Sequence, residues 1–145
     1  VRIFIPEALS QLSGEATVVI STALSGGNLA GRLEEAITAY GANRLALDVE
    51  LLRMDFALPA FDGKGTPLTE EQLQQLRGGR MTFFSRELCA NYFSYTADGK
   101  AHFVVFDTAA TIERKLQIAD KMGIEAAFFL YPEIKGIFRE LLSQD

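Results

Sequence analysis

The stretch His102–Lys115, HFVVFDTAATIERK, decides the fold, because its pattern is that of a strand running directly into a helix. The pair Asp98-Gly99 lies just before it and readily takes the positive φ angles of a type I′ turn. Tyr92–Thr96 and Ala101–Phe106 flank this pair, so they are predicted to form a β-hairpin.

The second half of the stretch is predicted to be a helix. Asp107 or Thr108 can cap its first turn, and Ile112, Leu116 and Ala119 then fall on one helical face. Many α/β proteins place their chemistry where a strand ends at an acidic residue ahead of a helix. We therefore look for functional residues at such strand ends.

Strands and helices also alternate toward the N-terminus. Thr17–Ser21 is apolar on both faces, as expected of a buried parallel strand. Leu29–Tyr40 carries apolar residues at helical spacing and is followed by Gly41, which can end a helix. Arg44–Leu52 is the next predicted strand. Strand, helix and strand in this order predict a right-handed crossover unit.

Shorter patterns complete the order of elements. They predict a strand at Arg2–Ile5, a helix capped by Thr69, a short strand at Met81–Phe84, a strand at Ala126–Tyr131 and a helix from Pro132. The order is strand, helix, strand, helix, hairpin, and then strand, helix, strand, helix. It predicts one α/β domain over residues 1–145, with helices packed on a mostly parallel sheet.

Composition excludes several classes of protein. The 145 residues are 48% hydrophobic, which is enough for one core, and the net charge is −5. The 14 basic residues form no stripe, so we expect no nucleic-acid partner, and no apolar run is long enough for a membrane span. Cys89 is the only cysteine and His102 the only histidine, so we expect no metal and no cofactor. Cys89 is predicted to be a buried packing residue.

Three segments resemble motifs of one family. His102–Lys115 is similar to H-x-V-W-F-E-D-A-R-S-I-x-x-K, Asn91–Tyr95 to P-Y-F-x-Y, and Asp55–Pro59 to D-W-x-L-P. In the first segment six positions match and two are close replacements: His102, Val104, Phe106, Ala109, Ile112 and Lys115, then Asp107 and Thr111. The motifs are those of glycoside hydrolase family 18, in the branch of spore-cortex and spore-germination hydrolases. The likeness covers roughly Thr17 to Pro132.

The resemblance implies a partial (β/α)8 TIM-barrel-like fold with helices outside and the hairpin inserted before the last strand. Arg44–Leu52 would be the seventh barrel strand and Ala126–Tyr131 the eighth. The chain begins at Val1 rather than Met, so we expect an upstream segment, and the resemblance implies that the chain is the C-terminal portion of a longer barrel. Open sheet edges and uncovered apolar faces then predict a homo-oligomer, or association with the N-terminal half.

Family 18 enzymes use a D-x-x-D-x-D-x-E motif on their fourth strand, and its glutamate protonates the leaving oxygen. The chain has one partial counterpart, Asn43–Glu50, in which Asn43 and Ala46 replace two aspartates. Asp48 and Glu50 are therefore weak catalytic candidates. Solvent-facing or salt-bridged strand-end carboxylates are the alternative interpretation of both.

Sugar rings stack on aromatic platforms in this family, yet the chain has no tryptophan, and Leu130 stands where the family has one after the last strand. Asp55, Phe56, Phe106 and Asp107 lie at predicted strand ends and are the candidate substrate-binding residues. For these four, a place in the core or in helix caps is the alternative.

The resemblance thus implies a family 18-like protein whose glycan contains N-acetylglucosamine, such as chitin or peptidoglycan, with the catalytic acid motif absent from this chain. A non-catalytic glycan-binding or scaffold module of a cell wall or spore is the alternative. Either function implies a glycan partner and an exported or envelope-associated location. We expect the chain alone to be inactive.

Overall fold

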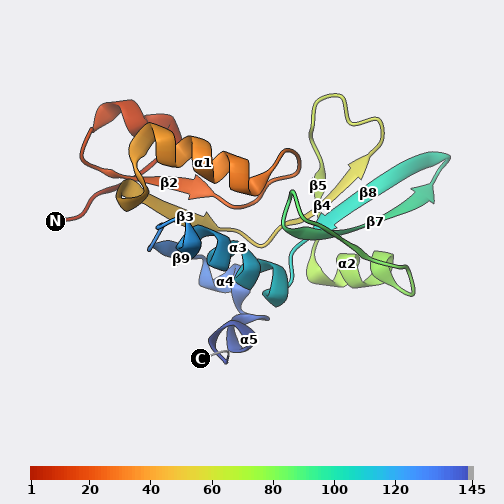
Figure 1. Ribbon diagram of the computed structural model, residues 1–145. Helices are drawn as coiled ribbons and strands as arrows, with labels where there is room; N and C mark the ends of the chain where they lie inside the picture. The colour runs from red at the N-terminus through yellow and green to blue at the C-terminus, as the bar shows by residue number, and fades with distance from the viewer. Residues whose placement is uncertain (144–145) are drawn as a thin grey trace.

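The structure is a computed structural model that describes residues 1–143, and it contains two sheets at opposite sides of the view in Figure 1. The strands are β1 Phe4–Pro6, β2 Thr17–Ser21, β3 Leu45–Val49, β4 Arg53–Ala57, β5 Thr66–Pro67, β6 Phe83–Ser85, β7 Ala90–Ala97, β8 Lys100–Phe106 and β9 Ala127–Phe129. The helices are α1 Leu29–Tyr40, α2 Glu70–Arg77, α3 Ala109–Lys121, α4 Tyr131–Ile134 and α5 Phe138–Leu142, with short 3₁₀ turns at Glu7–Leu12 and Ala42–Arg44.

One sheet is wholly parallel. Its strands lie in the order β1-β2-β3-β9, so each strand pairs with the one that precedes it in this sheet. A doubly wound sheet reverses its strand order at a switch point, whereas a (β/α)8 barrel does not. The order is therefore that of a barrel segment, which confirms the predicted α/β, partial-barrel class. Within residues 1–143 the sheet stays open, with β1 and β9 as its edges.

The second sheet is antiparallel, in the order β5-β4-β8-β7-β6. The predicted hairpin is its centre, and Asp98 and Gly99 both have positive φ, at 50° and 72°. The strand predicted over Arg44–Leu52 is confirmed as β3, which is shorter at both ends, whereas β4 was not predicted. β3 ends at Val49, and the chain crosses to β4, because Arg53–Ala57 pairs with β8. The insertion is thus a five-stranded sheet rather than a two-stranded hairpin.

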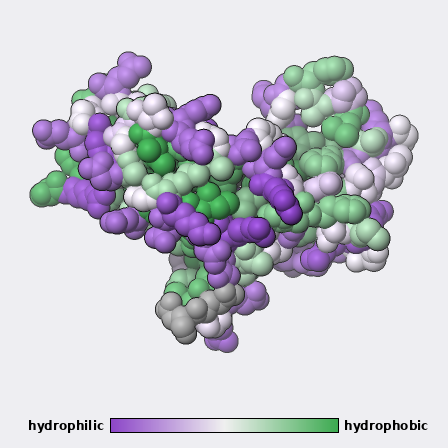
Figure 2. Space-filling view, viewed as in Figure 1, coloured by the Kyte–Doolittle hydropathy of each residue, from purple (hydrophilic) through white to green (hydrophobic). Residues whose placement is uncertain are grey.

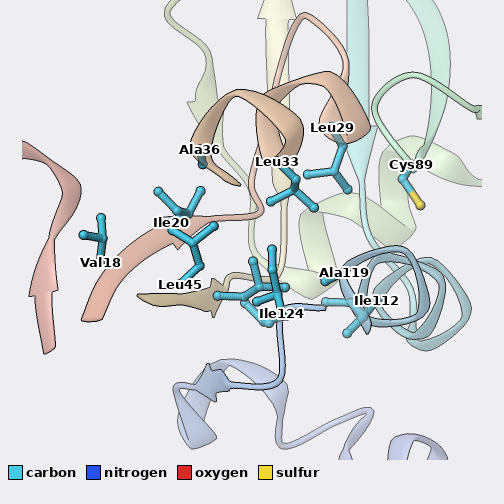
Figure 3. Close-up of a cluster of buried hydrophobic side chains, with 12 residues drawn as sticks. Val18, Ile20, Leu29, Leu33, Ala36, Leu45, Cys89, Ile112, Ala119 and Ile124 are labelled. Carbon is cyan, nitrogen blue, oxygen red and sulfur yellow. The ribbon is translucent and has the colours of Figure 1, made fainter. Parts of the chain in front are cut away.

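The main core lies between the parallel sheet and the two helices α1 and α3 (Figure 3). The core cluster includes Val18 and Ile20 from β2, Leu33 from α1 and Ile112 from α3. All four side chains are at most 1% exposed, and burying each such chain contributes about 1.5–3 kcal/mol. Cys89 is buried beside them, as predicted.

Helix ends follow the sequence signals with two exceptions. Thr108 caps α3 in a capping box with Thr111, so the cap is Thr108 and not Asp107. The single helix predicted from Pro132 is broken into α4 and α5, with Gly136 between them. Glycine costs about 1 kcal/mol in a helix interior, which favours a break there.

The antiparallel sheet is apolar on both faces. Helix α2 covers one face, where Leu73 packs on Phe93, Val104 and Phe106. The other face carries a separate cluster of five buried residues, Leu52, Phe56, Leu88, Ala90 and Val105. Hydrophobic residues also reach the surface of this lobe, at the right of Figure 2. Only one face of the insertion is therefore covered by a helix.

Candidate functional site

Carboxylates gather where β3 leaves the parallel sheet. Asp48 lies in β3 next to Ser21 of β2 in the strand register, and Glu50 follows the end of β3. Glu133 of α4 is close enough to act on the charge of Glu50. The carboxyl edge of parallel strands is where such folds bind ligands. The predicted pair Asp48 and Glu50 is thus brought together with Ser21 and Glu133, which sequence analysis missed.

The carboxyl group of Glu50 is the most perturbed of this group. Partial desolvation by the surrounding protein raises its pKa above the usual value, although the residue is exposed overall, and the negative charge of Asp48 raises it further. A hydrogen bond with Ser21 offsets part of this shift, and the charge of Glu133 adds to it. A carboxyl group with a raised pKa keeps its proton closer to neutral pH, as a general acid must.

Glu50 opens onto a groove between the two sheets. The groove has a volume of about 420 Å³, and its lining includes Ala23, Glu50, Met54, Pro67 and Glu133. The polar part of the lining also includes Arg53, whose guanidinium pairs with Glu70, and the rest of the lining is apolar. This combination suits an uncharged ligand with both hydroxyl groups and apolar faces.

An aromatic ladder runs along the face of the antiparallel sheet opposite α2. The rings of Phe83 and Tyr92 stack with centroids 5.6 Å apart, and Tyr92 lies 5.0 Å from Phe103. Phe83 is 49% exposed, whereas the other two are partly buried. A second groove of about 330 Å³ lies against Tyr92 and Phe103, with Gly26 and Gly27 on its other side.

The ladder and the Glu50 groove lie on the same side of the antiparallel sheet. Met54, which lines the Glu50 groove, is paired through Val105 with Tyr92, and residues paired in register share a face. Met54 and Ala23 also pack against the same cluster as Tyr92 and Phe103. The two features therefore form one continuous surface, from Phe83 to Glu50.

Asp55 lies on the other face of β4. Its two carboxylate oxygens accept hydrogen bonds within the sheet: the Tyr95 hydroxyl donates to Oδ2 at 2.5 Å, and Nδ1 of His102 is 3.0 Å from Oδ1. The Tyr95 and His102 rings stack, and the Arg80 guanidinium lies over Tyr95. Desolvation, and then the hydrogen bond and charge of Asp55, raise the pKa of Tyr95 to about 12. Asp55 thus holds a polar network under α2.

The candidate aromatic residues are buried. Phe56 is 6% exposed, and its ring fills the space beside Gly65, where a Cβ atom would come within 2.8 Å of it. Phe106 is 1% exposed on the α2 face, with Arg77 above its ring. Phe56 belongs to the buried cluster on which the ladder residues Tyr92 and Phe103 pack. Phe106 belongs to the core beneath α2.

Asp107 lies at the junction of the two sheets, where it is buried. Its Oδ2 accepts from Nζ of Lys115 at 2.8 Å and from the Leu52 amide at 3.1 Å, and its Oδ1 accepts from the Thr111 hydroxyl. Lys115 also donates to the Thr22 carbonyl. The four predicted substrate-binding residues therefore do not converge, since Asp55 and Phe106 face α2, Phe56 faces the ladder, and Asp107 sits inside the junction.

The ladder escaped sequence analysis because its residues come from three strands. Alternation in Tyr92-Phe93-Ser94 and His102-Phe103-Val104 indicates which residues share a face of the hairpin. The pairing of Phe83 with Tyr92 depends on how β6 aligns with β7, which the local sequence pattern does not specify. Within residues 1–143, no cluster of three or more His, Cys, Asp or Glu residues has the geometry of a metal site. The same residues include no helix with the length and hydrophobicity needed to cross a membrane.

No protein-family model matches the sequence, and no curated protein sequence matches it either. Solved structures do resemble the fold. The spore cortex-lytic enzyme SleL of Bacillus megaterium QM B1551 gives a TM-score of 0.61 at 19% identity, over 79% of this chain and 30% of SleL. SleL of Bacillus cereus gives 0.62 at 17% identity, over 86% and 32% of the two chains.

A third structure is ydhD of Bacillus subtilis, a proposed sporulation-specific glycosylase, with a TM-score of 0.63 at 17% identity over 88% of this chain and 52% of ydhD. The chain thus spans between 30% and 52% of the length of these three proteins. At this level of identity the likeness establishes the shared α/β, TIM-barrel-like fold.

Proposed function

We propose that this chain forms the glycan-holding part of a family 18-like glycosidase whose substrate is an N-acetylglucosamine-containing glycan such as peptidoglycan. The observation that carries the proposal is the continuous surface from Phe83 through Tyr92 to the Glu50 groove. Sugar rings present apolar C–H faces that stack on aromatic rings, and their hydroxyl groups donate to carboxylates. The names of the fold relatives, two spore cortex-lytic enzymes and a proposed glycosylase, support the same substrate class.

Catalysis by this chain alone is not part of the proposal. Glu50 has the raised pKa of an acid, but Asn43 and Ala46 stand where the family motif has aspartates. Without that charge coupling an acid of this type is poorly tuned. We expect no cleavage of chitin oligomers or peptidoglycan. Turnover that disappears in Glu50→Gln would contradict this expectation and make Glu50 the acid.

A non-catalytic glycan-binding module remains the second candidate, since the ladder alone suffices for it. The enzyme hypothesis is supported if a longer chain that includes this one cleaves the glycan and loses this activity when the strand-four carboxylates of the added segment are removed. Glycan binding without turnover in the same chain supports the module.

Binding is tested with N-acetylglucosamine oligomers by calorimetry and by amide chemical shifts. Tyr92→Ala and Phe83→Ala should each weaken binding by about two- to twelvefold, because each removes an aromatic contact worth on the order of 0.5–1.5 kcal/mol. Phe84→Ala is the matched control, since it removes the neighbouring ring of β6, which points to the other side of the strand. Equal affinity in all three variants and the unaltered chain would remove the ladder from the proposal.

A further inference from the structure

A separate groove lies between α3 and the turn that joins β6 to β7. Its volume is about 650 Å³. Cys89, Ala110 and Ile118 supply apolar parts of its lining, and the remaining lining residues are Phe84, Arg86, Glu113, Arg114, Gln117 and Lys121. Because Phe84 and Phe83 point to opposite sides of β6, this groove and the ladder are different surfaces.

Three cations line this groove in a chain whose net charge is −5. Arg86, Arg114 and Lys121 take part in none of the ion pairs formed among residues 1–143, which use Arg32, Arg53, His102 and Lys115. Arg114 and Lys121 are seven residues apart on α3, so they lie on one helical face. All three cations are exposed and keep their charge available for a ligand.

The walls of the groove are held in place by contacts outside it. The Leu29 amide of α1 donates to the Glu87 carbonyl at 2.8 Å, and the Leu88 amide donates to the Ser85 hydroxyl at 3.2 Å. Cys89 has a positive φ of 52° and is 1% exposed, so the turn is closed onto the core. The Arg114 guanidinium lies 5.0 Å from the centre of the Phe84 ring, which orients it.

We propose that this groove binds a short acidic peptide. Two carboxylates of the ligand pair with the arginines and with Lys121, and a small apolar side chain lies on Ala110 and Ile118. Glu113, the one acidic residue of the lining, accepts from a peptide N–H or an amine. Glu113 repels a ligand that is negatively charged along its whole length, so the mixed charges of the lining favour a peptide, which offers N–H donors beside its carboxylates. Peptide recognition deepens the proposed function and rests on it, because the sugars of peptidoglycan carry acidic peptides.

The experiment is a titration of the isotope-labelled 145-residue chain with L-alanyl-D-glutamate, followed by amide chemical shifts. We expect saturable shifts at Ala110, Arg114 and Gln117 and weaker binding as salt is added. Arg86→Gln and Arg114→Gln should each weaken binding about two- to fivefold, the range expected of exposed ion pairs, and the double variant should lose it. Lys100→Gln removes the same charge at the exposed hairpin turn and should leave affinity unchanged.

Two further probes identify the ligand chemistry. The diamide of the same dipeptide, which lacks both negative carboxylate charges, should not bind. Inorganic phosphate should bind more weakly than the dipeptide, and equal or tighter binding of phosphate overturns the assignment to a peptide. Unchanged dipeptide affinity in the Arg86→Gln, Arg114→Gln double variant, or shifts located elsewhere, overturns the site itself.

Tyr92→Ala separates this inference from the proposed glycan function. The variant should lose oligosaccharide binding and keep dipeptide binding. If the chain binds the dipeptide at the groove but no glycan, the proposed function fails and the peptide site stands. If it binds glycan at the ladder but no dipeptide, only the inference of this groove fails.

Discussion

Lys115 and Asp107 form a fully buried ion pair, with Nζ 2.8 Å from Oδ2 and no exposed part of either side chain. The pair connects three segments. Asp107 follows β8 and accepts from the amide of Leu52 after β3, while Lys115 of α3 donates to the carbonyl of Thr22 after β2. Thr22 directly follows Ser21, and Leu52 lies two residues after Glu50. The buried pair therefore holds the antiparallel sheet, the helix and the carboxyl edge of the parallel sheet in one arrangement.

Lys115→Met should destabilise the protein by about 3–5 kcal/mol, because it leaves the Asp107 carboxylate buried without its counter-charge. The double variant Asp107→Asn, Lys115→Met should recover most of this loss, since no buried charge remains. Denaturant unfolding of the two single variants and the double variant completes the cycle. Additive losses in the double variant would show that the two side chains act independently.

Removal of the charge of Glu50 should stabilise the protein, whereas removal of the charge of Lys115 destabilises it. The pKa of Glu50 is raised in the folded state, so the folded state binds the Glu50 proton more tightly and loses stability as pH rises above the ordinary value of 4.5. Glu50→Gln should therefore raise the melting temperature at neutral pH and have little effect below pH 4.5. Glu125→Gln makes the same change at an exposed position and serves as the control. A melting temperature lowered at neutral pH would contradict the assigned sign.

The raised pKa of Tyr95 predicts that the free energy of unfolding falls at alkaline pH. The pKa of this side chain is raised from 10 to about 12 by desolvation and by its hydrogen bond to Asp55, so its contribution is complete below pH 10 and lost between pH 10 and about 12. Tyr95→Phe should remove this part of the pH dependence. Melting curves and phenolate absorbance across that range measure it, with the exposed Tyr131→Phe as the control. Titration of the Tyr95 phenol at its ordinary pKa would contradict the partly buried hydrogen bond to Asp55.

Local signals in the sequence account for the elements that were predicted correctly. The capping box of Thr69 and Gln72, the apolar face of α1 and the Asp98-Gly99 turn each depend on residues a few positions apart. What was missed depends on pairing across long separations. β4 forms because Arg53–Ala57 pairs with β8, which lies about fifty residues later in the chain. That register places Asp55 on the face of the sheet that does not carry the ladder.

The same reason applies to the candidate site. Asp48 and Glu50 were found because they stand two residues apart in a segment that resembles a family motif, whereas Phe83, Tyr92 and Phe103 become a surface only through the strand register. Phe106 and Asp107 stand at a strand end in the sequence, yet packing of α2 and the Lys115 ion pair enclose them. A strand end indicates where a site can form, and tertiary packing decides which side chains remain open to a ligand.

The hairpin turn can be tested directly. Gly99 has a φ of 72°, a conformation that costs a residue with a Cβ atom roughly 1–2 kcal/mol. Gly99→Val should therefore destabilise the protein by about that amount, although no atom lies within 4 Å of the added Cβ. Gly79→Val is the control, since its φ is not in the left-handed region and its Cβ also meets nothing within 4 Å. Equal unfolding free energies for both variants would show that the turn tolerates the strain.

The open parallel sheet predicts self-association. Phe4 of β1 and Phe128 of β9 lie in edge contact, with ring centroids 4.8 Å apart, across the face that no helix of the described chain covers. These two rings remain 39% and 42% exposed, and Ile3 and Leu130 next to the same edges are exposed by 61% and 57%. Unpaired edges flanked by apolar side chains favour pairing with another chain.

We therefore propose that the 145-residue chain associates through β1 and β9 into a dimer or larger assembly, unless the remainder of a barrel occupies these edges. Light scattering at high protein concentration should give a mass above 16.0 kDa. Phe128→Asp should shift the population toward monomer, because it places a charge on the edge strand, whereas Met81→Asp, at an exposed position outside the parallel sheet, should not. A monodisperse monomer would show that the Phe4–Phe128 contact is enough to cover this face of the sheet.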